Sequence, residues 1–396
     1  MFQRNKILSL NRSLSRLYSS KADTLQRTSL YDLHLKNGAK MASFAGWSMP
    51  LFYKDMSALD SHIHTRKHCS LFDVSHMLQF KISGPDRIKF IENLIVSDVK
   101  ELPTGSGTLS LFLNKNGGIE DDLIVTNHAD FLYVVSNAGC AEKDWNHVTS
   151  SLKSFTEAGG NAKVEKIVDC SLVAIQGPES SKILQSLTKT DLSKMSFMSS
   201  QFMDLNGVSA HVARSGYTGE DGFEVSINSE KVNDFVSNLL KNDNVKLAGL
   251  APRDSLRIEA GLCLYGHDID QTTTPLEAGL TWTIGKRRKQ EGGFIGSDIV
   301  LEQIASKGGS RRRVGFVVQG APAREGALIF NSDGTEQIGI ITSGVPSPSL
   351  GTNIAMGYVN KGLNKKGTQV KIKVRNRMQD AEIVKMPFIQ SNYYKP

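Results

Sequence analysis

The sequence lacks the features that define several large classes of protein. Its 396 residues include four cysteines, which lie far apart with no C-x-x-C pair. This spacing argues against a disulfide framework or a zinc site and suits a reducing compartment. No apolar run approaches the roughly 18 residues of a membrane span, and no dinucleotide-binding fingerprint or H-E-x-x-H pair occurs. With 39% hydrophobic and 22% charged residues, the chain is instead typical of a globular protein of two or three domains that needs no membrane partner.

A second absence is local, because residues 1–22 contain no Asp or Glu. Basic residues there alternate with serine and apolar residues, a composition typical of mitochondrial targeting segments. The run 16–19 resembles a matrix-processing site cut after Tyr18. We therefore expect a mitochondrial presequence over residues 1–18; a disordered basic tail is the alternative. The formal net charge of +7, part of which lies in this leader, favours anionic partners.

An internal repeat indicates the fold class. Residues 82–94 and 175–187 both read as a strand, a Gly-Pro turn and a helix with an acidic residue in its first turn. Strand-like runs with short turns follow each unit, at 108–113, 119–126 and 131–136 after the first and at 208–213 and 223–227 after the second. This order predicts an α+β protein with two related lobes and antiparallel sheets, and not a doubly wound parallel fold.

The composition changes from about residue 286. Six short strand-like runs separated by turn residues, between residues 314 and 384, predict a small all-β barrel or sandwich. Basic clusters at 286–289 and 311–313 precede these runs. They are interpreted either as a solvated face or as a surface that docks an acidic protein, since no aromatic platform or recognition helix indicates nucleic acid.

Three consecutive acids in the run 116–125 form the first candidate site. An Asn-Gly-Gly turn leads into them, and an apolar run that reads as a buried strand follows. Alternation along a strand places Glu120 and Asp122 on one face and Asp121 on the other, so at least one carboxylate lies close to apolar surroundings. A paired structural acid or a solvated hairpin tip are the alternatives to a functional acid.

Two further segments carry candidate residues. The loop 214–222 has three glycines that permit close backbone approach, and it leads to Glu224 at the start of a strand; a solvated acidic turn is the alternative. Residues 253–261 predict a capped helix with an ion-paired face. The helix predicted at about 55–67 and the residue after it carry three histidines, which we interpret as surface or core residues rather than metal ligands: His62, His64 and His68.

Taken together, the motifs resemble the T-protein, or aminomethyltransferase, family of the glycine cleavage system over residues 28–394. The resemblance rests on many short motifs in family-like order and spacing: Phe44 to Trp47, Phe72 to Met77, Gly117 to Ile124, Val135 to Asn137, Gly216 to Gly222, Ala251 to Arg257, Gly261 to Gly266, Thr342 to Gly344, Ser347 to Leu350 and Ala355 to Tyr358.

The resemblance implies a cloverleaf of two folate-binding lobes and a C-terminal barrel. The folate-binding region would span 28–285, with 28–54 and 150–285 in one lobe and 55–149 in the other, and the barrel would span 310–391. The implied reaction transfers the methylene carbon from the S-aminomethyldihydrolipoyl arm of the H-protein to tetrahydrofolate, with release of ammonia. The implied partners are the lipoylated H-protein and the P- and L-proteins of the same complex, in the mitochondrial matrix.

The resemblance also assigns roles to residues and implies no metal. Asp122 matches the acid beside the reacting folate nitrogens, and it could act as a base, orient the folate or stabilise positive charge. Glu224 matches the carboxylate that binds the pterin, because one carboxylate can accept two adjacent N–H groups. Other matches are the folate-pocket arginine, a C-terminal tyrosine and residues that line the rest of the site: Arg253, Tyr393, Met77, Val135, Asn137, Tyr217 and Trp282.

Departures from the family pattern keep two alternatives open. His267 stands where relatives often have Gln or Asn, and the Lys-Gly-Cys motif of a related folate-binding family lacks its lysine here, before Cys263. A non-enzymatic folate-binding scaffold of that related family would bind folate without transfer. A folate-dependent demethylase module is the second alternative, although its relatives are usually fused to a flavin domain and no dinucleotide fingerprint is present.

Overall fold

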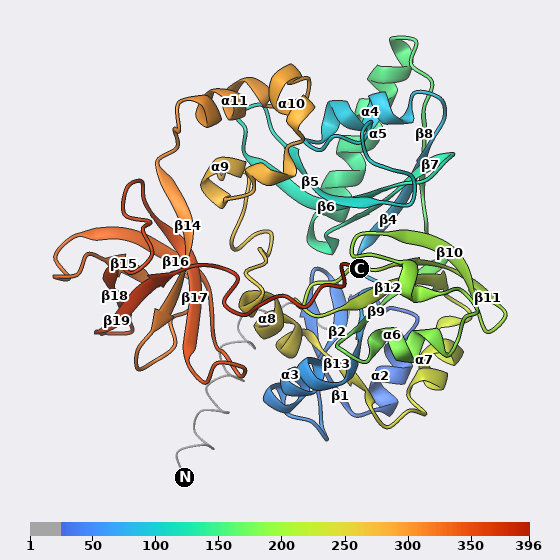
Figure 1. Cartoon of the computed structure of the whole chain (residues 1–396), viewed down its shortest axis with the longest axis horizontal. Coiled ribbons are helices and arrows are strands. Elements are labelled where there is room, and N and C mark those ends of the chain that lie inside the picture. The colour runs from blue at the N-terminus through green and yellow to red at the C-terminus, as the bar shows by residue number, and fades with distance from the viewer. Residues whose placement is uncertain (1–24) are drawn as a thin grey trace.

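The computed structural model describes residues 25–396, and its elements form three units around a common centre (Figure 1). A five-stranded sheet, a six-stranded sheet and a closed six-stranded barrel are the frameworks of the three units. The predicted class, two α+β lobes with largely antiparallel sheets and a C-terminal barrel in a cloverleaf, is confirmed. The predicted presequence lies outside the described residues. Within 25–396, no helix is both long and apolar enough to span a membrane.

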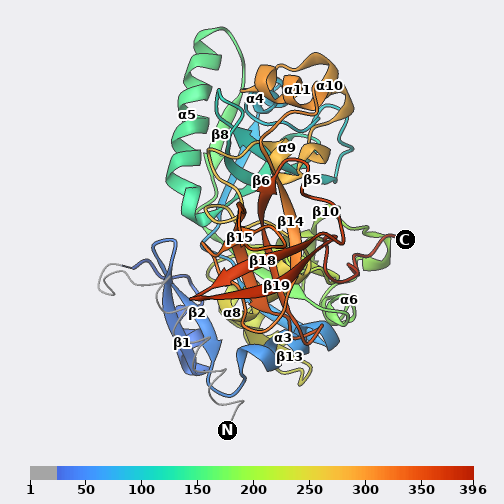
Figure 2. The same cartoon turned by 90° about the vertical axis from the view of Figure 1, so that its left-hand side faces the viewer.

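The first lobe is built on the sheet ordered β5-β6-β7-β4-β8. Phe80, Phe90 and Val134 are fully buried in its core. Figure 2 shows α5 on one side of this lobe and the connecting helices α10 and α11 on the other. The elements of the lobe are β4 (Leu78–Ser83), α4 (Arg87–Leu94), β5 (Gly107–Leu113), β6 (Ile119–Asn127), β7 (Phe131–Ser136), η2 (Ala138–Cys140), α5 (Ala141–Glu157) and β8 (Lys163–Lys166).

The second lobe is built on the sheet ordered β10-β11-β12-β9-β3-β13, in which only β13 and β3 pair in parallel among the strands described. A hairpin of β1 and β2, which the sequence suggested only as an irregular apolar stretch, adjoins it. The elements are α2 (Tyr31–Lys36), β1 (Ala39–Phe44), β2 (Trp47–Tyr53), α3 (Ala58–Lys67), β3 (Cys69–Asp73), β9 (Cys170–Gln176), α6 (Ser180–Gln185), η3 (Leu192–Lys194), β10 (Ser200–Leu205), β11 (Val208–Ala213), β12 (Gly222–Asn228), α7 (Val232–Leu239), β13 (Val245–Ala248) and α8 (Leu250–Glu259).

The internal repeat is present as β4 with α4 and β9 with α6. The turn glycine of the second unit, Gly177, has φ +127°, and a Cβ there would lie 2.0 Å from the carbonyl oxygen of His68, so only glycine fits. The acids of the two units, Asp86 and Glu179, are the N-cap residues of their helices and not members of the first turn. Each acid therefore stands one residue before its helix begins, and not in the first turn as the sequence predicted.

Sheet membership differs from the lobe bounds expected from the sequence. β3 falls inside the expected 55–149 lobe but pairs with β9 and β13 in the sheet of the other lobe. β8 falls inside the expected 150–285 segment but pairs with β4 in the first lobe. Strand pairing depends on partners that are distant in sequence, and the chain therefore crosses between lobes within these segments.

The C-terminal unit is a closed barrel ordered β14-β17-β16-β15-β18-β19, which decides between the predicted barrel and sandwich. Phe316, Ile329 and Ile372 are fully buried inside it. Short helices connect the second lobe to the barrel. The elements are α9 (Pro275–Ala278), η4 (Thr281–Thr283), α10 (Lys286–Glu291), α11 (Ser297–Ala305), β14 (Arg311–Val318), β15 (Leu328–Phe330), β16 (Gln337–Pro346), β17 (Asn353–Asn360), β18 (Gln369–Val374) and β19 (Arg377–Val384).

The basic clusters before the barrel are largely used in internal contacts. Arg287 forms ion pairs with Glu92 at 2.7 Å and with Asp98 at 2.8 Å, and so ties α10 to the first lobe. Arg288 is buried, and Arg313 donates to the carbonyl oxygen of Ala278. The interpretation of these clusters as a docking surface for an acidic protein is therefore wrong for these three arginines, because their guanidinium groups already have partners within the chain.

A capping box begins α9, where the chain leaves the cavity region for the barrel. Thr274 Oγ1 accepts a hydrogen bond from the Glu277 backbone N–H at 3.3 Å, and Glu277 accepts one from the Thr274 N–H. Thr274→Ala is expected to lower the free energy of unfolding by about 1 kcal/mol, measured by denaturant titration. Thr149→Ala in the interior of α5 is the control, because alanine is favourable there. An equal loss in both variants would contradict the capping role.

Candidate functional site

A cavity of about 780 Å³ lies where the two lobes, the connection to the barrel and the C-terminal segment meet. Most of its wall is apolar, and a few acidic, basic and amide side chains reach into it. This combination is typical of sites for organic ligands, in which apolar surfaces enclose the ligand and a few polar groups orient it.

Asp122 reaches the cavity from β6. Along this strand Ile119, Asp121 and Leu123 are buried on the core side, whereas Asp122 lies on the opposite face and lines the cavity. The alternation predicted from the sequence is thus present, with the residue identities as expected. The strand places one carboxylate in the core and the next one in the cavity.

Asn137 holds both of these carboxylates. Its backbone N–H donates to Asp121 Oδ2 at 3.0 Å, and its side-chain Nδ2 lies 2.9 Å from Asp121 Oδ1 and 2.9 Å from Asp122 Oδ1. Asn137 immediately follows β7, the neighbour of β6 in the sheet. This residue therefore fixes the orientation of the Asp122 carboxylate in addition to lining the cavity.

The surroundings of Asp122 raise its pKa to about 7, first through burial and second through the nearby charge of Asp121. Burial also raises the pKa of Asp121, which forms a side-chain hydrogen bond with the buried Asp144 of α5. The carboxyl groups of Asp121 and Asp144 are in contact and cannot both ionise easily, so they share a proton. Because the pKa of Asp122 is about 7, its carboxyl group can both accept a proton and hold one near neutral pH.

Asp121→Asn provides a test of this electrostatic arrangement. The ionised Asp122 is the form that can accept a proton, so activity should fall as pH drops through about 7. Replacing Asp121 removes a neighbouring negative charge, which lowers the pKa of Asp122 and should move this limb to lower pH by up to about one unit. The pH dependence of the single-turnover rate measures the shift. An unmoved limb with a uniformly lower rate would indicate a purely structural role for Asp121.

Glu224 lines the cavity from the second lobe, on β12. It pairs in register with Ala174 of β9 and Ala213 of β11, so the strand is held on both sides. Ser215 Oγ donates to Glu224 Oε2 at 3.0 Å. A carboxylate can accept about four hydrogen bonds, so Glu224 can accept further hydrogen bonds from a ligand in addition to the one from Ser215.

Arg253 enters the cavity from α8. Its guanidinium carbon lies 4.8 Å from the centre of the Tyr217 ring, a cation–π distance. Its Nη1 is buried without a hydrogen-bond partner among residues 25–396. Burial lowers the pKa of Arg253, and the nearby Glu224 opposes this effect. A buried and unpaired guanidinium donor is costly, and an acceptor on a ligand would satisfy it.

Tyr393 completes the wall from the C-terminal segment and stacks on Phe197, with ring centres 4.0 Å apart. Trp282 also lines the cavity and is 63% exposed, so it lies at the mouth. The structure brings all nine residues predicted from the sequence into this single cavity: Asp122, Glu224, Arg253, Tyr393, Met77, Val135, Asn137, Tyr217 and Trp282. Their individual roles stay predictions.

Comparisons with known proteins agree with this arrangement. Residues 30–288 match the family description "GCVT N-terminal domain", and residues 311–390 match "Glycine cleavage T-protein C-terminal barrel domain". The chain belongs to the glycine cleavage T-protein family. Proteins named mitochondrial aminomethyltransferase from mouse and potato are 52% and 50% identical to it; each alignment covers 96% of this chain and 94% of the relative.

A solved member of the T-protein family has the same fold. The crystal structure of the glycine cleavage system aminomethyltransferase T from Bartonella henselae is 37% identical to this chain and superposes with a TM-score of 0.87. The match covers 94% of this chain and all of that one. The fold and the domain order described above are therefore those of the T-protein family.

Several cavity residues were not predicted as site residues from the sequence. His76 is buried, its Nδ1 has no hydrogen-bond partner among residues 25–396, and burial lowers its pKa to about 4. Arg257 also lines the cavity, and its Nη1 is 2.5 Å from Asp268 Oδ2. The sequence signal for His76 was its place in the motif 72–77, but the burial of a single imidazole cannot be read from a motif.

The residues that departed from the T-protein family pattern also lie at the cavity. His267 lines it and is 2.9 Å from Glu325 of the barrel. Cys263 lines it as well; its backbone oxygen accepts a hydrogen bond from the Tyr217 hydroxyl, and burial raises the pKa of its thiol to about 12. A thiol with so high a pKa is a poor nucleophile near neutral pH.

The three histidines of the 55–68 region have partners within the described chain, most of them distant in sequence. His62 is fully buried and contacts Ser255 at 2.7 Å and Glu259 at 3.0 Å. His64 contacts the backbone oxygens of Cys69 and Asn244, and His68 Nδ1 lies 3.5 Å from Glu179 Oε2. Across residues 25–396, no group of three or more His, Cys, Asp or Glu side chains is placed to hold a metal ion.

Proposed function

We propose that the chain transfers the methylene carbon of an aminomethyl group, carried as a thioether on the dihydrolipoyl arm of an H-protein, to tetrahydrofolate. Membership of the T-protein family makes the chain an aminomethyltransferase of glycine cleavage that acts with folate. The observation that carries the finer proposal is the single cavity that presents Asp122, Glu224 and Arg253 together. An acid of pKa about 7, a second carboxylate and an unpaired guanidinium match a ligand with both N–H and C=O groups.

Folate recognition follows from the chemistry of the lining. The pterin edge presents an amine and a ring N–H side by side, and the Glu224 carboxylate can accept both. Ser215 and the flanking strands hold this carboxylate in place. The Arg253 guanidinium can donate to a carbonyl or carboxylate oxygen of the folate. The apolar side chains Met77 and Val135 line the remaining wall and exclude water.

Transfer requires two protons to leave the two reacting nitrogens of tetrahydrofolate. One is taken up as the amino group departs as ammonia, and the other as the C–S bond breaks to regenerate the thiol. We assign the movement of one of these protons to Asp122, because its pKa of about 7 lets it accept and then release a proton. Its negative charge would also stabilise the electron-poor methylene carbon between the two bond changes.

The partners and location follow from the same proposal. The lipoylated H-protein would supply the aminomethyl arm, and the P- and L-proteins of the glycine cleavage system would load it and reoxidise it. The relatives named mitochondrial support a mitochondrial location. The matrix and a presequence over residues 1–18 are the finer proposals.

Single-turnover transfer from aminomethyl-loaded H-protein tests this function. The expected result is ammonia release that depends on tetrahydrofolate, with one equivalent of methylenetetrahydrofolate formed per loaded arm. Folate binding without ammonia release would instead support the non-enzymatic scaffold. Oxidative demethylation of an N-methyl substrate in the presence of a flavoprotein would support the demethylase module.

A further inference from the structure

The last residues of the chain cross from the barrel back to the second lobe (Figure 1) and end at the surface, beside this lobe (Figure 2). Backbone hydrogen bonds attach this segment to the lobe at three points. Phe388 N–H donates to the carbonyl oxygen of Glu259 at 2.9 Å, Asn392 N–H donates to that of Gly219 at 2.7 Å, and the carbonyl oxygen of Tyr394 accepts from Phe197 at 2.8 Å. The segment is therefore a wall of the cavity that is held by contacts outside the barrel.

Side chains hold the segment as well: the Tyr394 hydroxyl donates to the carbonyl oxygen of Ser193 at 3.1 Å, and Asn392 makes a contact with a buried acid. Asn392 Nδ2 donates to Glu220 Oε2 at 2.9 Å, and Glu220 is 3% exposed. The neighbouring residue, Tyr393, lines the cavity and stacks on Phe197. Since adjacent residues share a peptide unit, the position of Asn392 limits where the Tyr393 ring can lie.

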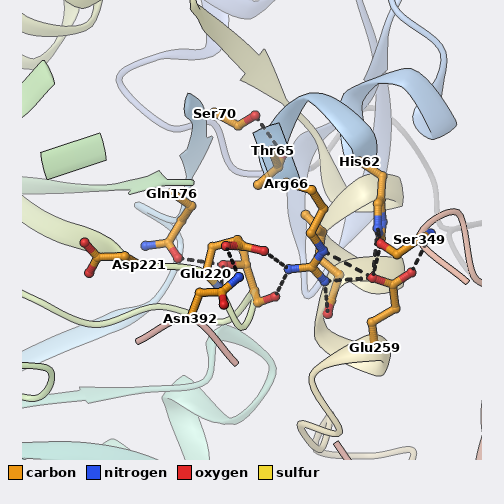
Figure 3. Close-up of polar contacts among 12 residues, drawn as sticks. His62, Thr65, Arg66, Ser70, Gln176, Glu220, Asp221, Glu259, Ser349 and Asn392 are labelled. Atoms are coloured by element: carbon orange, nitrogen blue, oxygen red, sulfur yellow. Dashed lines mark hydrogen bonds and ion pairs between the residues drawn. The ribbon is translucent and has the colours of Figure 1, made fainter. Parts of the chain in front are cut away.

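Arg66 of α3 anchors Glu220 from the other side (Figure 3). Its Nη1 is 2.9 Å from Glu220 Oε1, and its Nη2 is 2.8 Å from Glu259 Oε2. One guanidinium thus lies between two buried carboxylates. Glu259 in turn accepts hydrogen bonds from two serines of the barrel, Ser347 and Ser349. The sequence predicted an ion-paired face for the helix of Glu259. Arg257 and Asp254 of this helix do form an ion pair at 2.9 Å, whereas Glu259 contacts the distant Arg66 and His62.

Arg66, Glu220 and Asn392 are not among the cavity-lining residues of the described chain. They nevertheless join three of its walls: the loop that carries Tyr217, the helix α8 that carries Arg253, and the C-terminal segment that carries Tyr393. A buried charge that is fully paired in this way has a strongly preferred geometry, because loss of one partner leaves an uncompensated charge.

We propose that Arg66, Glu220 and Asn392 form a latch that fixes the C-terminal segment, and that Asn392 is a positioning residue for Tyr393 in the cavity. The consequence for folate rests on the function proposed above, whereas the attachment of the segment does not.

Asn392→Asp tests the latch in the full-length chain. The side chain keeps its size, but its amide donor is replaced by a carboxylate that faces Glu220. The charges then repel, and the C-terminal residues should detach. Digestion with carboxypeptidase Y, which can release the C-terminal Pro396, is expected to remove the last residues about tenfold faster. The affinity for tetrahydrofolate is expected to fall about tenfold, which corresponds to about 1.4 kcal/mol. Asn353→Asp is the matched control, because the Nδ2 of Asn353 donates to Gly320 on the barrel.

Two further variants separate positioning from a general loss of structure. Glu220→Gln combined with Asn392→Asp exchanges donor and acceptor, so it should restore protection from carboxypeptidase. In a Tyr393→Ala background, Asn392→Asp should cause no further loss of folate affinity, because the positioned ring is already absent.

The outcomes distinguish the latch from the proposed function. Unchanged digestion in Asn392→Asp would overturn the latch, whatever the chain binds. Faster digestion with unchanged folate affinity, or an equal loss in the Tyr393→Ala background, would overturn the positioning role. If the unaltered chain does not bind tetrahydrofolate at all, the proposed function fails, and the digestion assay alone still decides the latch.

Discussion

Asp122→Asn is expected to slow aminomethyl transfer by roughly two to four orders of magnitude. The amide keeps the shape of the carboxylate but can neither take a proton nor carry negative charge. Asn137 donates to Asp122 Oδ1 at 2.9 Å, and an asparagine at 122 can still present a carbonyl oxygen there. We therefore expect normal folding and tetrahydrofolate binding, with the loss confined to the single-turnover rate measured with aminomethyl-loaded H-protein.

Glu120→Gln is the matched control for this variant. Glu120 lies on the same face of β6 two residues earlier, but it is 28% exposed and pairs with Lys143 at 3.1 Å. Such a partly exposed pair contributes little, so the control should retain most of its activity. Near-normal transfer by Asp122→Asn would remove Asp122 from the mechanism. A comparable loss in both variants would mean that any charge on this face matters equally.

Glu224→Gln is expected to weaken tetrahydrofolate binding by about 1.5 to 3 kcal/mol, or roughly 10- to 150-fold. The amide can accept one hydrogen bond from the pterin edge, but its NH₂ group opposes the second pterin N–H. Ser215 can still donate to the remaining oxygen, so the strand should be undisturbed. Isothermal titration calorimetry measures the change in affinity directly.

Glu165→Gln serves as the control for binding, because Glu165 lies on the strand β8, is 47% exposed and pairs with Lys163. It should leave the affinity unchanged. Equal affinities of Glu224→Gln and the unaltered chain would rule out the pterin contact. The transfer rate at saturating folate should fall less than in Asp122→Asn, since Glu224 is assigned to binding rather than to proton movement.

The sequence predicted the site well where a local pattern determines the face on which a side chain lies. Strand alternation was enough to place Asp122 on the opposite face from Asp121, because the side-chain period of a strand is fixed. The strand–turn–helix repeat and an all-β C-terminal unit were also evident from local patterns, which left the choice between barrel and sandwich open. The roles of Glu224 and Arg253 came from resemblance alone, since nothing local distinguishes a ligand-binding acid from a solvated one.

Features that depend on distant partners could not be predicted. The Asp121–Asp144 contact joins a strand to a helix, and Arg66 meets Glu220 and Glu259 from three separate segments. The same limit explains why the docking interpretation was wrong for Arg287, Arg288 and Arg313. A run of arginines reads as an exposed surface, yet Arg287 finds Glu92 and Asp98 almost two hundred positions away in the chain.

A crystal structure of the chain with tetrahydrofolate bound would show whether the cavity binds folate as proposed. We expect the pterin amine and ring N–H to contact the Glu224 carboxylate, an acceptor of the folate to reach Arg253 Nη1, and the reacting nitrogens to face Asp122. A folate bound outside this cavity, or with its reacting nitrogens directed away from Asp122, would contradict the proposed function.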